Sequence, residues 1–145
     1  MVKNKENGFT FLEMILVLSI VSLVTFAVIP IGGKWIRTTS EENGIQTFVA
    51  AIHNLQAYSM ANHVVTKLHF TNSGSTYITS VPGKFEFART DFPAGLNLAS
   101  SSRMQDVWFN ANGDIRNSGT LVFRTSSGLT EIRFQFQRGR MIIYE

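Results

Sequence analysis

A long apolar run near the amino terminus constrains this chain more than any other feature. From Phe9 to Gly33 the only charged residue is Glu13. As an α-helix, a run of this length measures about 37 Å, more than the roughly 30 Å hydrocarbon core of a bilayer. A cleaved secretory signal is the alternative, but its apolar part is usually about 7–15 residues long and ends in an A-x-A-like site. The segment "FAVIPIGG" contains no such site. The run therefore predicts one transmembrane helix over residues 9–33.

Glu13 is costly inside this run. A carboxylate in a membrane-spanning helix raises the insertion free energy by roughly 2.5–3.5 kcal/mol or more. One interpretation is that Glu13 lies near the start of the span and reaches the nearby aqueous face. The other is that a second molecule supplies a cationic partner, because carboxylates in lipid are usually paired or functional. The residues alone leave both open.

Composition excludes several kinds of chemistry. The chain has no cysteine, so it has no disulfide, thiolate metal site or thiol nucleophile. The three histidines, His53, His63 and His69, form no H-E-x-x-H motif, and neither G-x-S-x-G nor a phosphate-binding G-x-x-x-x-G-K occurs. We therefore predict a non-enzyme with no cofactor and no metal. The net charge of +3 is too small to indicate nucleic-acid binding by itself.

Two helix signals follow the apolar run. Pro30, Gly32 and Gly33 predict a weak point, because proline removes a helix hydrogen bond and glycine adds backbone freedom. Residues 40–64 then have the spacing of an amphipathic helix, with apolar side chains three and four positions apart. These side chains are Ile45, Phe48, Val49, Ile52, Leu55 and Tyr58.

The sequence does not settle whether the two helical stretches join. Thr39 and Glu42 stand three apart, as in a capping box, which favours a new helix start at that point. Gly44 also argues against one continuous helix. If the helix is continuous, the capping box is coincidental.

From Val64 onward the apolar period changes to two. Seven segments are predicted as strands: "VVTKLHF", "YITSV", "KFEFA", "VWFN", "TLVFRT", "TEIRFQFQ" and "RMIIYE". Glycine-containing segments such as "TNSGS" and "TSSGL" separate them. In "TEIRFQFQ", Ile132, Phe134 and Phe136 alternate with polar residues, which is typical of a half-buried antiparallel strand. The segment "RTDFPAGLNLASSSRMQD" is predicted to be a loop. The fold class is therefore α+β, a long amino-terminal helix packed on a small antiparallel sheet.

A family resemblance rests on "KENGFTFLE" and the apolar run that follows it. The order of a polar leader with Lys3 and Lys5, then Gly8, Phe9, Thr10, Leu12 and Glu13, resembles the type IV pilin and pseudopilin signature. The resemblance implies that a prepilin peptidase cuts after Gly8 and that Phe9 is N-methylated. It also implies that Glu13 neutralises the terminal amine of a neighbouring subunit during assembly. Outside this motif, the helix followed by strands resembles the minor pseudopilins, and most of all the cysteine-free D-type pseudopilin of Gram-positive competence (ComG) systems.

This resemblance implies a division of the chain and a set of partners. Residues 1–8 would be the leader, 9–33 the transmembrane and assembly helix, 34–63 its second half, and 64–145 the globular domain. The implied partners are other pseudopilins, the prepilin peptidase and, indirectly, an assembly ATPase and its membrane platform protein. The implied localisation is the cell membrane with a cytosolic amino terminus, followed by a filament at the cell surface. Orientation rests on the resemblance, because lysines and arginines flank the apolar run on both sides.

The predicted function is that of a minor pseudopilin in a competence filament that takes up DNA in transformation. One alternative is an H-type pseudopilin of type II secretion. The other alternative is a DNA-binding minor pilin adaptor. Arg124, Arg133, Arg138 and Arg140 gather near the last predicted hairpin, where they could contact phosphates without reading bases. The other interpretation of these arginines is an ordinary solvated sheet face.

Overall fold

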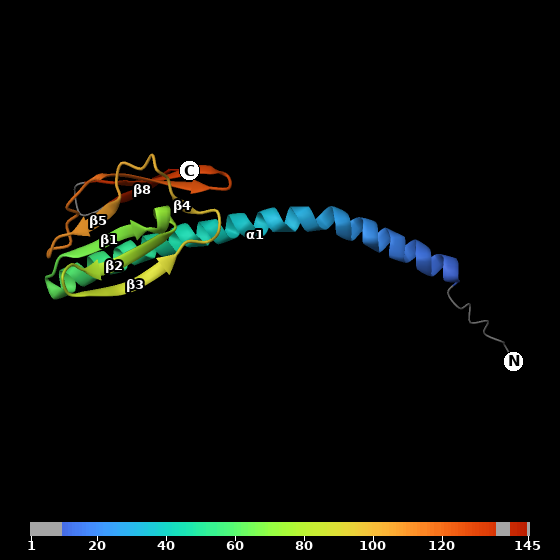
Figure 1. Cartoon of the computed structure of the whole chain (residues 1–145), viewed down its shortest axis with the longest axis horizontal. Helices are drawn as coiled ribbons and strands as arrows, with labels where there is room; N and C mark the ends of the chain where they lie inside the picture. The colour runs from blue at the N-terminus through green and yellow to red at the C-terminus, as the bar shows by residue number, and fades with distance from the viewer. Residues whose placement is uncertain (1–9, 136–139, 145) are drawn as a thin grey trace. The chain divides into compact units, whose positions relative to one another are not determined.

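The computed structural model describes residues 10–135 and 140–144, apart from the side chains of residues 27–38. The chain divides into two compact units, Met1–Ile36 and Arg37–Glu145. Each is described by itself below. One helix, eight strands and a short 3-10 turn at Asn72–Gly74 make up the described secondary structure (Figure 1).

The helix α1 runs from Phe11 to Asn62. Thr39 and Glu42 therefore lie inside it, so the two helical stretches are continuous and the capping-box spacing of these two residues is coincidental. The helix instead begins with a cap at Thr10. The backbone N–H of Glu13 donates to Thr10 Oγ1 at 3.3 Å, and that of Met14 donates to the Thr10 carbonyl at 3.2 Å. Thr10 and Glu13 also stand three apart, so the capping-box spacing was present at the true start.

Two antiparallel sheets follow α1, where the sequence predicted one. The first has the order β3-β2-β1-β5, whose strands are labelled in Figure 1, and the second has the order β4-β6-β7-β8. The strands are β1 Thr66–Thr71, β2 Thr76–Val81, β3 Phe85–Asp91, β4 Asn97–Leu98, β5 Asp106–Phe109, β6 Gly119–Thr125, β7 Gly128–Phe134 and β8 Met141–Tyr144. All seven predicted strands are present, and the α+β class is confirmed. Phe136 lies outside the described residues.

The core joins the carboxyl-terminal half of α1 to both sheets. Phe48 on α1 is fully buried, and its ring centroid lies 5.3 Å from that of Tyr77 in the first sheet and 5.1 Å from that of Phe123 in the second. The predicted apolar face of the helix supplies four buried side chains, Ile45, Phe48, Ile52 and Leu55. Burial of this face stabilises the helix more than its intrinsic propensity does. Burial also raises the pKa of the Tyr77 phenol above its usual value, and a hydrogen bond with Thr90 opposes that rise.

The predicted loop over residues 89–106 is partly wrong. Strand β3 extends to Asp91, and the short β4 pairs with β6 through Asn97–Arg124 and Leu98–Phe123. Between them the chain crosses α1 beside Gly44. A Cβ atom at position 44 would lie 2.8 Å from Pro93 Cδ and 2.8 Å from Leu96 Cδ2, closer than packed carbon atoms approach. Gly44 therefore permits this crossing, whereas its sequence context suggested only a weak point in the helix.

Candidate functional site

The first turn of α1 holds the one described residue of the predicted processing and assembly site. Glu13 is exposed, and its backbone N–H is held by the Thr10 cap. Its carboxylate lies at the amino-terminal end of the helix, where the helix dipole favours negative charge. Within residues 10–135 and 140–144, Glu13 forms no ion pair. Gly8 and Phe9 lie outside the described residues.

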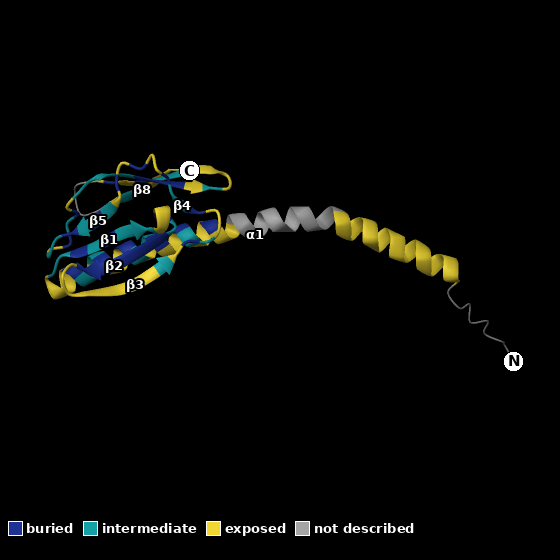
Figure 2. Cartoon of the chain, viewed as in Figure 1, coloured by how far each residue is buried: buried dark blue, intermediate teal, exposed yellow. Residues whose placement is uncertain are grey.

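The next four turns of α1 present apolar side chains on every side. From Phe11 to Phe26 the large apolar residues are exposed, as the yellow part of α1 in Figure 2 shows. The three hydroxyls among them donate to carbonyls one turn back: Ser19 to Ile15 at 2.8 Å, Ser22 to Leu18 at 2.8 Å and Thr25 to Val21 at 2.7 Å. These polar side chains therefore need no external partner. The Glu13 carboxylate is the only charged group in this stretch.

The predicted transmembrane helix over residues 9–33 and the predicted weak point at Pro30, Gly32 and Gly33 both include residues whose side chains are not described. No helix among the described residues is both long enough and apolar enough to cross a membrane. Helix α1 passes through Pro30, Gly32 and Gly33 without ending, but their side-chain environment is not described. The predicted weak point there remains a prediction.

The arginines predicted as a patch belong to the second sheet. Leu121 and Phe123 on β6 and Ile132 and Phe134 on β7 are buried. Because side chains alternate along a strand, Arg124 and Arg133 lie on the opposite, outer face. Arg140 begins the returning arm of the last hairpin, where its carbonyl accepts from the Gln135 N–H at 3.1 Å. Arg138 lies outside the described residues.

The structure adds Arg103 to this outer face. A surface hollow of about 380 Å³ is lined by Arg103 and Arg133 together with Ser101, Thr120, Val122, Leu129 and Glu131. The hydrogen bonds from Ala99 N–H to the Val122 carbonyl and from Met104 N–H to the Thr120 carbonyl bring the segment around Arg103 against β6. Arg103 follows a run of serines in the predicted loop, so no sequence signal pointed to it. We name Arg103, Arg124, Arg133 and Arg140 the arginine face.

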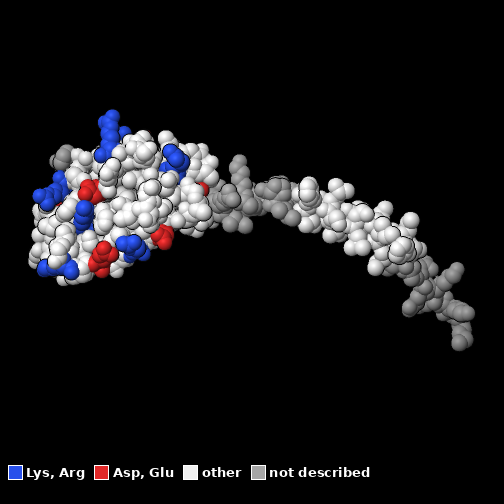
Figure 3. Space-filling view, viewed as in Figure 1, with Lys and Arg blue, Asp and Glu red and all other residues white. Residues whose placement is uncertain are grey.

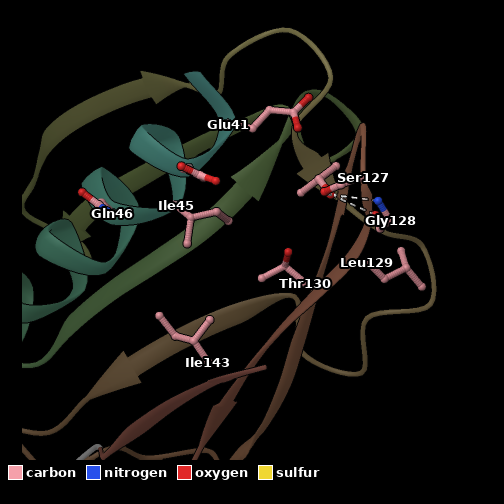
Figure 4. A pocket seen from close by; sticks show the side chains of 10 residues that line it. Glu41, Ile45, Gln46, Ser127, Gly128, Leu129, Thr130 and Ile143 are labelled. Atoms are coloured by element: carbon pink, nitrogen blue, oxygen red, sulfur yellow. Dashed lines mark hydrogen bonds between the residues drawn. The ribbon is translucent and has the colours of Figure 1, made fainter. Parts of the chain in front are cut away.

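A buried carboxylate lies elsewhere in the globular unit, and sequence reasoning missed it. Glu41 on α1 is 3% exposed, and its Oε2 accepts from the N–H and the hydroxyl of Ser126 at 3.0 and 2.8 Å. These bonds hold the β6–β7 turn against the helix. Beside them is a hollow of about 570 Å³, across which Ile45 on α1 faces Thr130 and Ile143 on the strands (Figure 4). The role of Glu41 is therefore to position the turn.

Comparison with known proteins agrees with this geometry. Residues 3–29 match the family described as the prokaryotic N-terminal methylation motif. The fold is similar to that of the type IV minor pilin FimU of Pseudomonas aeruginosa (strain PAO1). In one crystal form of FimU the TM-score is 0.62 at 13% identity, with 74% of this chain and 90% of that chain covered. In a second crystal form the TM-score is 0.59 at 13% identity, with 72% and 92% covered. No curated protein sequence matches this chain significantly.

The chain therefore combines a prokaryotic N-terminal methylation motif with a fold similar to that of a type IV minor pilin. The methylation motif implies processing by a prepilin peptidase, and it covers Glu13 and the exposed apolar segment of α1. The likeness to FimU concerns the fold alone, because the two sequences share few residues.

Proposed function

We propose that this protein is a minor pilin-type subunit of a filament in the cell envelope. The observation that carries the proposal is the conjunction of three features in one chain. They are the methylation motif over residues 3–29, a single carboxylate at the start of an exposed apolar helix, and a pilin fold. A helix that exposes apolar side chains on every side requires lipid or other helices around it, and a filament built on such helices provides both environments in turn.

The proposed mechanism begins at the membrane. Residues 9–33 hold the subunit there with its amino terminus in the cytosol, and the prepilin peptidase cuts after Gly8. The cut creates a cation, the amine of Phe9, which is then N-methylated. A cytosolic ATPase and its membrane platform extract the processed subunit. Packing between the apolar helices then holds it among the other pilins.

Glu13 sets the register of that packing. The amine of one subunit reaches the Glu13 carboxylate of its neighbour within the apolar interior of the filament. In a low dielectric this pair attracts more strongly than a surface salt bridge, although desolvation offsets part of the gain. Only one axial offset between neighbouring helices brings the two charges together.

The filament we propose is of the competence type and serves DNA uptake in transformation. The support is the overall likeness to the small, cysteine-free D-type pseudopilin of Gram-positive competence (ComG) systems. The alternative is an H-type pseudopilin of type II secretion, whose filament pushes folded proteins outward. Both machines use the same processing and assembly chemistry, so the globular unit and its partners must decide.

Deletion of the gene separates these two machines. We expect transformation frequency to fall by several orders of magnitude, while the amount of secreted protein in the medium stays at the parental level. Both are measured in one strain, with the intact gene restored in trans as the control. Normal transformation with impaired secretion assigns the protein to the secretion machine instead.

A second candidate function, DNA contact, is favoured by the arginine face. Arg103, Arg124, Arg133 and Arg140 share one sheet face with a single acidic residue, Glu131, among the strand residues there. Figure 3 shows basic side chains on the globular unit. A cationic surface of this kind holds phosphates and reads no bases.

Salt dependence tests the DNA contact. The full chain in detergent, titrated with labelled duplex DNA, should bind weakly, with affinity that falls steeply with salt and shows no sequence preference. Arg133→Glu combined with Arg140→Glu should abolish binding at low salt. Arg116→Glu, at an exposed position after β5, is the matched control and should bind almost normally. Equal binding by all three proteins would leave the arginine face as a solvated surface.

A further inference from the structure

Strand β3 is an uncovered edge of the first sheet. It pairs on one side with β2, and no other described strand pairs with its second side. Its residues Phe85–Asp91 are exposed except for Thr90, which is half-buried, and Figure 2 shows β3 in yellow along most of its length. An edge strand with free backbone N–H and C=O groups can receive another strand. Natural proteins usually protect such edges against unspecific pairing. The side chains on β3 therefore determine which strand this edge can receive.

Four charges follow one another along this edge with alternating sign. They are Lys84, Glu86, Arg89 and Asp91. Blue and red patches alternate in Figure 3 along the lower border of the globular unit, where Figure 1 places β3. Lys84, Glu86 and Arg89 form no ion pair within the described part of the chain, and Asp91 accepts a hydrogen bond from Thr76 at 2.6 Å. The four charges are therefore still available to a partner.

The spacing of these charges is self-complementary. In an antiparallel pair of two identical strands, residues at equal distances from the two-fold axis face each other. With the axis between Phe87 and Ala88, Glu86 faces Arg89 of the second copy and Lys84 faces Asp91 of the second copy. Facing residues also lie on the same side of the sheet. The pairing of β3 with β2 also places Glu86 and Arg89 on one side of the sheet. Glu86 pairs with Ser80 and Arg89 with Ile78, and these two β2 residues are two positions apart, so they lie on the same side of β2.

We propose that two copies of this chain associate through antiparallel pairing of their β3 strands. Two-fold symmetry repeats each ion pair, so four opposite-charge contacts line one face of the joint sheet. Each such cross-strand pair stabilises modestly, whereas like charges in the same places destabilise. This association is independent of α1 and of filament assembly.

The other side of β3 supplies apolar contact for the same dimer. Phe85 and Phe87 are 48% and 38% exposed, and their ring centroids lie 5.0 Å apart. The Phe87 ring also packs on Tyr58 of α1 at 4.5 Å, beside a hollow of about 270 Å³ lined by Leu55 and Ala88 among others. The register between β2 and β3 shifts at Thr79/Ser80, which leaves Phe87 without a partner on β2. Phe87 is adjacent to the proposed axis, so the rings of both copies meet there.

Charge reversal tests the register. Sedimentation of the full chain in detergent should show a dimer, and Glu86→Arg should weaken it roughly tenfold, because both symmetry-related pairs become repulsive. Adding Arg89→Glu to the same chain restores opposite charges across the axis, so this double variant should regain parental affinity. Arg116→Glu, remote from β3, is the control and should leave the affinity unchanged. The proposal is overturned if Glu86→Arg associates normally or if the double variant does no better than Glu86→Arg alone.

Cross-linking provides a second, independent readout. The chain has no cysteine, so introduced thiols are the only ones present. A mixture of Glu86→Cys chains and Arg89→Cys chains should form a mixed disulfide on mild oxidation, since facing Cα atoms lie about 4.5–5.5 Å apart, within the range that a disulfide spans. A mixture of Glu86→Cys and Arg116→Cys chains is the control for random collision and for association through α1. A mixed-disulfide yield no higher than this control also overturns the proposal, and another protein then becomes the partner to seek for this edge.

Discussion

Replacing Glu13 by glutamine is expected to leave membrane insertion and cleavage after Gly8 intact and to keep the subunit out of filaments. Glutamine preserves the shape of the side chain and removes only its charge. The amine of an arriving subunit would then enter the apolar interior without a counter-charge, which is strongly unfavourable. We expect the fraction of processed subunit recovered in sheared filaments or cross-linked multimers to fall by roughly tenfold or more.

Two further variants sharpen this experiment. Glu13→Asp keeps the charge but withdraws it by about one methylene, so partial assembly is expected. Glu42→Gln removes another exposed carboxylate of α1 and should assemble normally. Normal assembly of Glu13→Gln would show that the carboxylate only reaches the aqueous face, and the proposed pairing with the terminal amine would be wrong.

Gly8→Val should block processing completely. A peptidase that cuts after this residue must draw an extended, unhindered backbone into its site, and valine adds a branched side chain that restricts the backbone and adds bulk. Mass spectrometry of the parent chain should find a mature protein that begins at methylated Phe9. The Gly8→Val protein should keep its leader and be absent from filaments, because no free Phe9 amine is created.

The matched control for this variant is Gly33→Val. It makes the same substitution at the far end of the apolar run, so the leader should be removed as in the parent chain. A parent protein that keeps its leader in a cell with an active prepilin peptidase would contradict the processing proposal. So would a Gly8→Val chain that is cut normally.

Local patterns were enough to predict the packed face of α1 and seven of the eight described strands. Apolar spacing of three and four identified the face of α1 that carries Phe48 and Ile52, because a helix of fixed period places those side chains together wherever it packs. Alternation of period two identified strands such as β7, whose Ile132 and Phe134 are buried. The processing motif is also local. Gly8, Phe9 and Glu13 lie within a few residues of one another, so their order in the sequence is enough to predict a processing site.

These local patterns could not predict which strands pair with one another. An alternating strand shows that one of its faces is buried, but it does not show which strand lies beside it. The sequence therefore predicted one sheet, whereas the structure has two that meet on Phe48. The two-residue β4 was missed for a related reason, since Asn97 and Leu98 become a strand only through pairing with β6.

The structural roles of some single residues also depend on tertiary contacts. Gly44 looked like a weak point in a helix, yet it provides room for Pro93 and Leu96 to cross α1. Arg103 joined the arginine face only because the segment around it packs against β6. What the sequence determined by itself was the helical or strand character of most segments, because each depends on neighbours in the chain. The sheet edges, the arginine face and the crossing of the chain over α1 depend on residues far apart in the sequence. These residues come together only when the whole core packs.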